Sequence, residues 1–505
     1  MLLLSIFFYL TSNLAICQEA KNIQHLIIYT SSYKKEATDL KKYRTKNGLL
    51  SITKNAEEIF DEAKNDDAFC RGYESECYLD IRNKIDGVDS KAFETLFGLG
   101  KSYNGKIQDY AGLIRAYIRN FKIKNPSLKY VVLMGDPHKI PPRFTQQKKS
   151  VPRYKYIGTR DITIPTDFYY VEVFSKWEPT NRVNYLRLDT PQKEPYVNYP
   201  FARTFYTPPK EVAPNCVDSM TPLPTVAGTT KTADYITIPV KLHDSLISVG
   251  RIIKKPDDTD KTKGTIENYI TRLKSWEKSI ISSPIVIVTA GEDVGGLRKE
   301  STTFLKDKSS ALDYRDKIIF IDPEVTTNKN DIKKIITDTR FNIIWPQGHG
   351  SIDGICCTQA TTGNKACTYN IEPIDISSTK ANGFLISGAC EISGYIGTNH
   401  VTYNDSKSKQ SFGEAALLNG VVGVYGNYLG GTNGEDCVNI ATINSIYELT
   451  KGGKETTIGK ALLKVYKDML TETPVAGLAA EKCYPTKYQL LNRVYLGDPA
   501  AKVKI

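Results

Sequence analysis

Two short segments of the sequence place a histidine and a cysteine in settings suited to nucleophilic chemistry. The first is Gln347–Ser351, where His349 stands between two glycines, and the second is Ser387–Glu391, where Cys390 follows a Gly-Ala pair. Small neighbours let a substrate backbone approach closely. A thiolate nucleophile needs a proton-transfer partner, and His349 can serve Cys390 in that role. The pair predicts the catalytic dyad of a cysteine peptidase.

Attack on a peptide carbonyl also requires hydrogen-bond donors for the negative oxygen that forms. We expect the backbone N–H groups of Gly350 and Cys390 to be these donors. His349 would stabilise the Cys390 thiolate as an imidazolium and then donate its proton to the departing amine. The alternative is a packed histidine in a strand-terminal turn and a small core cysteine. The chain holds only 5 histidines, which favours the catalytic interpretation.

Both motifs follow compact apolar runs, Phe341–Trp345 before the histidine and Phe384–Ile386 before the cysteine. Runs of this kind predict buried parallel strands. In open α/β sheets, functional groups gather at the carboxyl ends of the strands. We therefore expect His349 and Cys390 to meet at one edge of one sheet.

The order of elements along the 505 residues predicts an α/β fold with parallel sheets. Residues 18–138 form an expected N-terminal α/β subdomain, 139–233 an irregular linker or insertion, and 234–505 a catalytic subdomain. Strands are expected at His25–Thr30, Leu49–Thr53, Tyr130–Met134, Leu246–Gly250, Pro284–Thr289, Ile318–Asp322 and Val421–Tyr425, and helices at Glu36–Lys46, Asp109–Lys122, Thr265–Ser279, Asp331–Thr339 and Ala415–Leu418. Ser411 and Glu414 have the spacing of a capping box.

The first 17 residues lack charged side chains and are mainly apolar, which predicts a signal peptide cut before Gln18 and a secreted or extracytoplasmic protein. A lipid anchor on Cys17 is disfavoured because Ile16 is large for the preceding position. No later stretch is long enough to span a bilayer.

The chain has 10 cysteines, of which Cys17 lies in the expected signal, so 9 remain afterwards. Exported thiols tend to pair, and an odd number leaves one free. Cys390 is the most economical choice for the free thiol, and Cys70 with Cys77 is the expected local disulfide. The alternative is that several cysteines are buried free thiols.

Composition and spacing exclude other functions. The net charge of +11 is spread along the chain and no nucleic-acid module is evident. Serine-hydrolase elbows, His-Glu-x-x-His and paired Cys-x-x-Cys motifs are absent, so we expect no required cofactor. Asp257, Asp258 and Asp260 could hold a structural calcium ion, although solvated acids are favoured because EF-hand spacing fails. The substrates expected are proteins or peptides, and nothing indicates the oligomeric state.

Several further segments, in chain order, resemble those of gingipain-type cysteine peptidases of the caspase-like clan. They are Tyr130–Asp136, Ile140-Pro141, Asp167–Tyr170, Ser248–Arg251, His349-Gly350, Cys390, Ser411–Glu414, Gly420–Gly426 and Tyr495–Pro499. The resemblance implies two stacked α/β subdomains, the second caspase-like. It also implies endopeptidase activity from His349 and Cys390, with preference for a defined P1 side chain.

Two other functions are compatible with the same residues. The sequence Cys390–Gly394 departs from the family's commoner pattern, which would suit an inactive homologue used as a binding or scaffold protein. A transpeptidase or ligase is the other alternative, because an amine instead of water can capture an acyl-enzyme.

Overall fold

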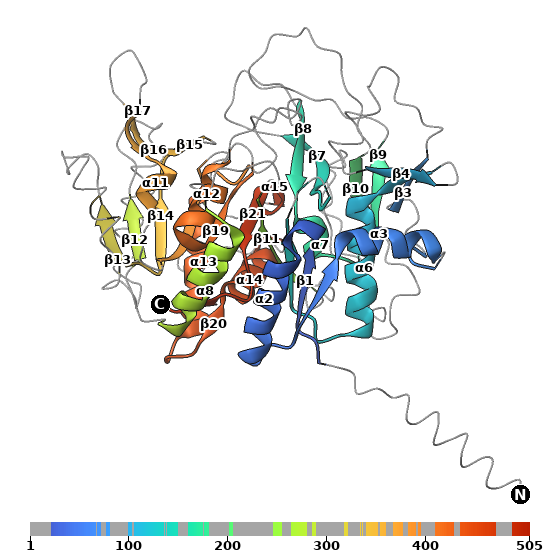
Figure 1. Cartoon of the computed structure of the whole chain (residues 1–505). Helices are drawn as coiled ribbons and strands as arrows, with labels where there is room; N and C mark the ends of the chain where they lie inside the picture. The colour runs from blue at the N-terminus through green and yellow to red at the C-terminus, as the bar shows by residue number, and fades with distance from the viewer. Residues whose placement is uncertain are drawn as a thin grey trace, which may run out of the picture.

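Short aliphatic runs form the strands of a ten-stranded sheet in the computed structural model (Figure 1). Its strands, in spatial order, are β13 (Ile318–Ile321), β12 (Ile285–Val288), β14 (Ile343–Pro346), β18 (Asn382–Ser387), β19 (Val421–Asn427), β21 (Arg493–Gly497), β11 (Ser248–Ile252), β6 (Tyr130–Met134), β1 (His25–Tyr29) and β2 (Ser51–Asn55). The structure describes residues 22–66, 68–71, 77–80, 99–103, 106–135, 137, 139–149, 160–174, 176–180, 201–205, 246–254, 264–279, 285–288, 318–321, 334, 336, 340–351, 354–359, 367–376, 382–389, 392–394, 410–428, 435–470 and 487–505.

The sheet consists of two parallel halves. Strands β2, β1, β6 and β11 pair in parallel, and so do β13, β12, β14, β18 and β19. β21 lies between the halves, antiparallel to β19 and in contact with β11. Strands buried on both faces are expected to be continuously apolar, and β1, β6, β14 and β19 are buried along their whole length. The predicted α/β class with mainly parallel sheets is confirmed.

Helices pack along the sheet (Figure 1). Helix α2 (Lys34–Lys46) contacts α8 (Ile266–Lys278), which contacts α12 (Phe412–Asn419), and α13 (Glu435–Thr450) packs on α14 (Ile458–Leu470). Helix α6 (Tyr110–Lys124) is capped by the Asp109 carboxylate, which accepts a hydrogen bond from the N–H of Gly112. The predicted capping box of Ser411 and Glu414 is present at the start of α12.

The stretch predicted to be irregular contains regular elements in its described parts. Strands β7 (Arg143–Lys149) and β8 (Arg160–Thr166) form an antiparallel hairpin, followed by helix α7 (Phe168–Val171) and the antiparallel pair β9 (Lys176–Thr180) and β10 (Phe201–Phe205). A two-bond ion pair ties this segment to the sheet, because Arg251 Nε and Nη2 lie 2.5 and 2.7 Å from the Asp167 carboxylate. β11 lies inside the range 234–505, yet it pairs with β6 along its full length. The subdomain boundaries remain a prediction.

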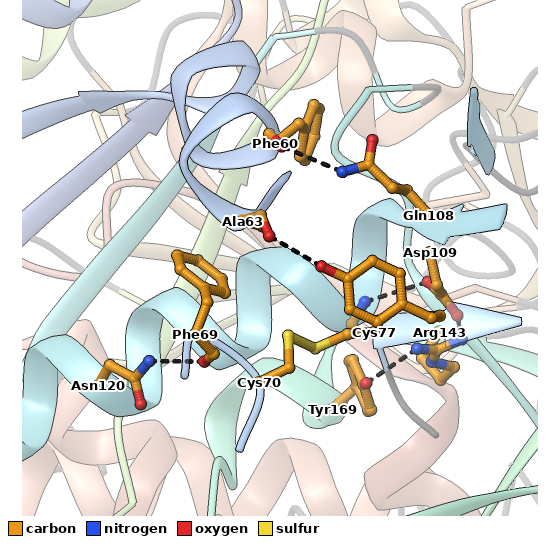
Figure 2. Close-up of a disulfide and its surroundings, with 12 residues drawn as sticks. Phe60, Ala63, Phe69, Cys70, Cys77, Gln108, Asp109, Asn120, Arg143 and Tyr169 are labelled. Carbon is orange, nitrogen blue, oxygen red and sulfur yellow. Dashed lines mark hydrogen bonds and ion pairs between the residues drawn. A yellow bond between two sulfur atoms is a disulfide. The ribbon is translucent and has the colours of Figure 1, made fainter. Parts of the chain in front are cut away.

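The predicted disulfide between Cys70 and Cys77 is present (Figure 2). Beside it, the Asn120 amide donates a hydrogen bond to the Phe69 carbonyl at 2.9 Å. Cys437, in α13, is also disulfide-bonded. The predicted signal peptide, 1–17, and the three acids Asp257, Asp258 and Asp260, for which calcium was a possible ligand, lie outside the described residues. Among the described helices, none is both long and apolar enough to cross a membrane.

Buried charges connect the two halves of the sheet. Arg44 of α2 donates to Asp498 at 2.7 Å and to Glu277 of α8 at 2.8 Å, and His25 Nε2 lies 3.3 Å from Asp498. All of these groups are shielded from solvent. Burial alone would raise the pKa of Asp498, but the Arg44 guanidinium and His25 outweigh it and hold the pKa well below its usual range.

Replacing Asp498 tests this connection. We expect Asp498→Asn to lower the free energy of unfolding by about 3 kcal/mol at pH 7, because Arg44 loses a buried counterion. Asp61→Asn is the matched control: Asp61 pairs with Lys64 at the surface with its side chain 71% exposed, and its loss should cost less than about 1 kcal/mol. Urea unfolding of the three proteins measures both values.

The pH dependence has a defined sign. Folding lowers the pKa of Asp498, so its stabilisation is complete above about pH 4 and is lost as the pH falls below the unfolded value. The difference between the parent protein and Asp498→Asn should therefore shrink at pH 3. A difference that grows in acid would contradict this account.

Candidate active site

The strands that precede the two motifs are direct neighbours in the sheet. β14 and β18 pair in parallel, with Ile343 opposite Phe384 and Ile344 opposite Leu385. All four side chains are buried. Because neighbouring parallel strands end at the same edge of a sheet, the chain leaves β14 and β18 side by side. The prediction that both motifs follow buried parallel strands is confirmed.

The hydroxyl of Ser387, the last residue of β18, connects the two strand ends. Its Oγ donates to the carbonyl oxygen of Pro346, the last residue of β14, at 2.8 Å, and accepts from the N–H of Ala389 at 3.2 Å. Ser387 is buried, so neither hydrogen bond competes with bulk water. A single side chain therefore links the end of the histidine strand to the start of the cysteine turn.

Groups from two further strands hold the turn itself. Arg493, on β21, donates from Nη1 to the carbonyl of Ser387 at 2.8 Å, and Asn427, at the end of β19, donates from Nδ2 to the carbonyl of Gly388 at 2.8 Å. Beyond the predicted nucleophile, the N–H of Ser393 donates to the backbone carbonyl of Asn427 at 3.0 Å. The turn is thus fixed before and after the cysteine position.

The turn lies directly on two glycines. A Cβ atom at Gly426 would stand 2.6 Å from Ser393 Oγ and 2.7 Å from Ile392 Cδ1, and one at Gly413 would stand 2.7 Å from the Ile392 carbonyl. The N–H of Gly413 donates to that same carbonyl at 2.6 Å. Only glycine allows so close an approach of the turn to β19 and α12.

A buried positive charge lies beneath the turn. The Arg493 side chain is only 2% exposed, and its guanidinium stands 5.2 Å from the ring centre of Tyr425. Burial, together with the neighbouring Tyr425, raises the pKa of Tyr466 well above its usual value, so that phenol stays neutral. A guanidinium remains charged at any physiological pH. A positive charge therefore stands in hydrogen-bond contact with the Ser387 carbonyl, at the start of the turn.

Asn427 also carries a stability cost. Its side chain is fully buried, and its Oδ1 atom has no hydrogen-bond partner within the described part of the chain. An unsatisfied buried acceptor costs about 1–3 kcal/mol. The Nδ2 atom of the same amide does make a hydrogen bond, and its acceptor is the Gly388 carbonyl in the turn.

The histidine motif opens a small antiparallel sheet. His349 is the first residue of β15 (His349–Ser351), which pairs with β16 (Gly354–Gln359), and β16 pairs with β17 (Cys367–Ile371). Before it, Gln347, which directly follows β14, is buried. Pairing of β15 with β16 therefore holds the backbone of His349 and Gly350 in an extended conformation shortly after the end of β14.

The structure places the ends of the two preceding strands side by side, but it does not describe every atom of the predicted site. The backbones of His349 and Gly350 are described, whereas the His349 side chain and the whole of Cys390 lie outside the described residues. Cys390 follows directly after Ala389, which is buried at 3% exposure. The dyad and the two oxyanion donors therefore stay predictions. In the ranges described, no group of three or more His, Cys, Asp and Glu side chains could hold a metal ion.

Sequence reasoning missed two residues that shape this site, Asn427 and Arg493. Asn427 had a weak signal, because it ends the apolar, glycine-rich run Val421–Gly426 with a polar side chain. Arg493 had none, since a buried arginine in a strand cannot be told from an exposed one without the fold. Ser387 stood within the cysteine motif, but its contact with Pro346 depends on strand order.

The model of peptidase family C25 matches residues 18–504. The chain belongs to peptidase family C25, the gingipain family. The match covers both halves of the sheet and both motifs, so the resemblance given by the short segments is confirmed. A search among curated proteins found no match.

Similar folds occur among solved structures. The crystal structure of the Arg-specific cysteine proteinase gingipain R (RgpB) matches with a TM-score of 0.48 and 13% identity, over 96% of this chain and 79% of that one. The complex of the pro- and mature domains of Porphyromonas gingivalis RgpB matches with a TM-score of 0.48 and 13% identity, over 95% and 79%.

The hydroxyl bridge of Ser387 can be tested by its effect on stability. We expect Ser387→Ala to lower the free energy of unfolding by about 1–2 kcal/mol, because it leaves the Pro346 carbonyl and the Ala389 N–H without their partner. Ser445→Ala is the matched control, since the buried Ser445 Oγ has no hydrogen-bond partner among the described residues. Denaturant unfolding should show little change for the control, and equal losses in both variants would contradict the bridge.

Proposed function

We propose that the chain is an exported cysteine endopeptidase in which Cys390 is the nucleophile and His349 transfers protons. The observation that carries this proposal is the parallel pairing of β14 with β18, in a member of peptidase family C25. This pairing supports a meeting of the His-Gly and Gly-Ala-Cys segments at one edge of the sheet, because neighbouring parallel strands end at the same edge. The substrates are then proteins or peptides, and the chemistry needs no cofactor.

The reaction begins with the thiolate of Cys390 beside the imidazolium of His349. The sulfur attacks the peptide carbonyl carbon, and the carbonyl oxygen takes the negative charge, accepted by the N–H groups of Gly350 and Cys390. When the tetrahedral intermediate collapses, the C–N bond breaks and His349 gives its proton to the departing amine. A thioester between the substrate acyl group and Cys390 remains.

Water completes the cycle. Neutral His349 takes a proton from the attacking water, whose oxygen adds to the thioester carbonyl. Collapse breaks the C–S bond, releases the carboxylic acid product and restores the thiolate–imidazolium pair. We infer that the buried Arg493, which donates to the Ser387 carbonyl at 2.8 Å, supports the thiolate at both stages through its positive charge.

The nucleophile is tested by substitution. Cys390→Ala and His349→Ala should each reduce cleavage of a peptide library by about 10⁴-fold or more, because each removes a group that acts in both half-reactions. His400→Ala is the matched control for loss of an imidazole and should cleave normally. Product formation is followed by mass spectrometry, and circular dichroism checks that each variant folds.

The outcomes separate the proposed peptidase from its alternatives. Undiminished cleavage by Cys390→Ala would eliminate Cys390 as nucleophile. A parent protein that neither cleaves peptides nor forms a covalent adduct with peptidyl electrophiles at Cys390 would be an inactive binding or scaffold homologue. Peptide joined to an added amine, instead of hydrolysed product, would identify a ligase.

Export is the second part of the proposal. It is supported by the uncharged apolar segment Met1–Cys17 and by the disulfide between Cys70 and Cys77, a bond typical of oxidising compartments. N-terminal sequencing of the protein from its native cells should begin at Gln18, with the protein outside the cytoplasm. An intact Met1 in the cytoplasmic fraction would contradict export, and a lipid on Cys17 would replace free secretion with anchoring.

A further inference from the structure

Asn427 contacts the cysteine turn on both sides of the predicted nucleophile. Its side-chain Nδ2 donates to the carbonyl of Gly388, two residues before Cys390, at 2.8 Å. Its own backbone carbonyl accepts from the N–H of Ser393, three residues after Cys390, at 3.0 Å. One residue at the end of β19 therefore brackets the turn.

The side-chain contact falls on the part of the turn that most needs an external constraint. Gly388 has no Cβ, so its backbone dihedrals are restricted less than those of any other residue type. The amide of Asn427 fixes the carbonyl of Gly388, and with it the plane of the peptide that leads to Ala389. The N–H on the other side of the same peptide donates to the Ser387 hydroxyl at 3.2 Å, so without the Asn427 bond this plane would be held on one side only and could rotate enough to displace the following cysteine.

The amide is retained although an apolar side chain would avoid its cost. Asn427 is fully buried, and its Oδ1 lacks a hydrogen-bond partner among the residues that the structure describes. A buried acceptor without a partner costs free energy. The contact that the Asn427 amide makes in return is the Nδ2 bond to the Gly388 carbonyl in the turn.

We propose that Asn427 is a positioning residue for the peptidase reaction, an inference that rests on the proposed function of Cys390. Its amide holds the peptide after Gly388 in one orientation and thereby sets where the Cys390 sulfur stands relative to His349. Asn427 does not touch the reacting atoms in this account. It acts only through the turn.

Other contacts allow the role to be tested without unfolding the protein. Ser387 remains bound to Arg493 and to Pro346 when the Asn427 side chain is changed. The bond from Ser393 to Asn427 is made by the backbone carbonyl and also survives substitution. Loss of the amide should therefore loosen the middle of the turn while both of its ends stay attached.

Kinetics of Asn427→Ala and of the isosteric Asn427→Asp provide the first test. Displacement of a catalytic group by about 1 Å can reduce a rate by about 100-fold, so we expect kcat to fall by about 30- to 100-fold in both variants. KM should change by less than about 2-fold, because the substrate-binding surface is intact. The substrate is the peptide cleaved best in the library.

Asn439→Ala is the matched control. Asn439 is a fully buried asparagine in α13 whose amide has no hydrogen-bond partner in the described part of the chain. Its removal deletes the same group without touching the turn, and kcat should stay within about 2-fold of the parent value. A similar loss of kcat in the Asn439 and Asn427 variants would overturn the positioning role.

A second measurement does not depend on peptidase activity. Hydrogen exchange of peptides covering residues 387–394 should be faster in Asn427→Ala than in the parent protein, while exchange in β6 is unchanged. Iodoacetamide alkylation of Cys390, followed against pH, should shift toward higher pH in the same variant, because a displaced thiolate loses its stabilising surroundings.

Kinetics on one side, and hydrogen exchange with alkylation on the other, distinguish failure of the proposed function from failure of the positioning role. A parent protein that cleaves no peptide refutes the proposed function, and the turn is then judged by exchange and alkylation alone. Unchanged exchange and alkylation in Asn427→Ala would overturn the positioning role whatever the activity. Unchanged kcat in both Asn427 variants of an active enzyme would overturn it as well.

Discussion

The parallel pairing of β14 with β18 is the constraint on which the candidate site depends. It brings together two segments that are 41 residues apart in the sequence, and the Ser387 hydroxyl locks the ends of the two strands to each other. The side-chain contacts that Asn427 and Arg493 make with the cysteine turn then follow from the order of strands in the sheet. β19 contributes Asn427 and β21 contributes Arg493 because they come next after β18. The candidate site therefore depends on the order of the strands in the sheet as well as on the two sequence motifs.

The same sheet order explains how distant parts of the chain support the site. β21 carries Arg493 at its start and leads into Asp498 at its end. Arg493 fixes the cysteine turn, while Asp498 joins the buried charges of Arg44 and His25 in the first half of the sheet. One strand near the end of the sequence thus links the N-terminal half to the region around the turn. Removing one member of such a buried group leaves its partner charged and unpaired, which is strongly destabilising.

Much of the fold could be predicted from the sequence because its strands are buried on both faces. Tyr130–Met134 forms β6 with the predicted bounds, and β1, β12, β13 and β19 lie within two residues of theirs. The hairpin of β7 and β8 and the small sheet of β15, β16 and β17 were missed. Their sequences, such as Arg143–Lys149, are polar and lack a continuous apolar run, so they resemble loops until a partner strand is known.

The sequence predicted the two motifs of the candidate site, but it did not predict the residues that hold the cysteine turn. The motifs around His349 and Cys390 are visible because glycine and alanine flank reactive side chains, and this local pattern needs no knowledge of the fold. Ser387, Asn427 and Arg493 act through contacts between residues 39 to 106 positions apart, and no local pattern encodes such contacts. Their roles depend on hydrogen bonds that form only when the sheet places these residues next to one another.

The most direct test of the account is a crystal structure of the protein with a peptidyl electrophile bound. The account predicts a covalent bond from the Cys390 sulfur to the inhibitor and a His349 ring nitrogen within about 4 Å of that sulfur, both at the edge where β14 and β18 end. A Cys390 sulfur held in a disulfide, or a His349 ring on the opposite face of the sheet, would contradict it.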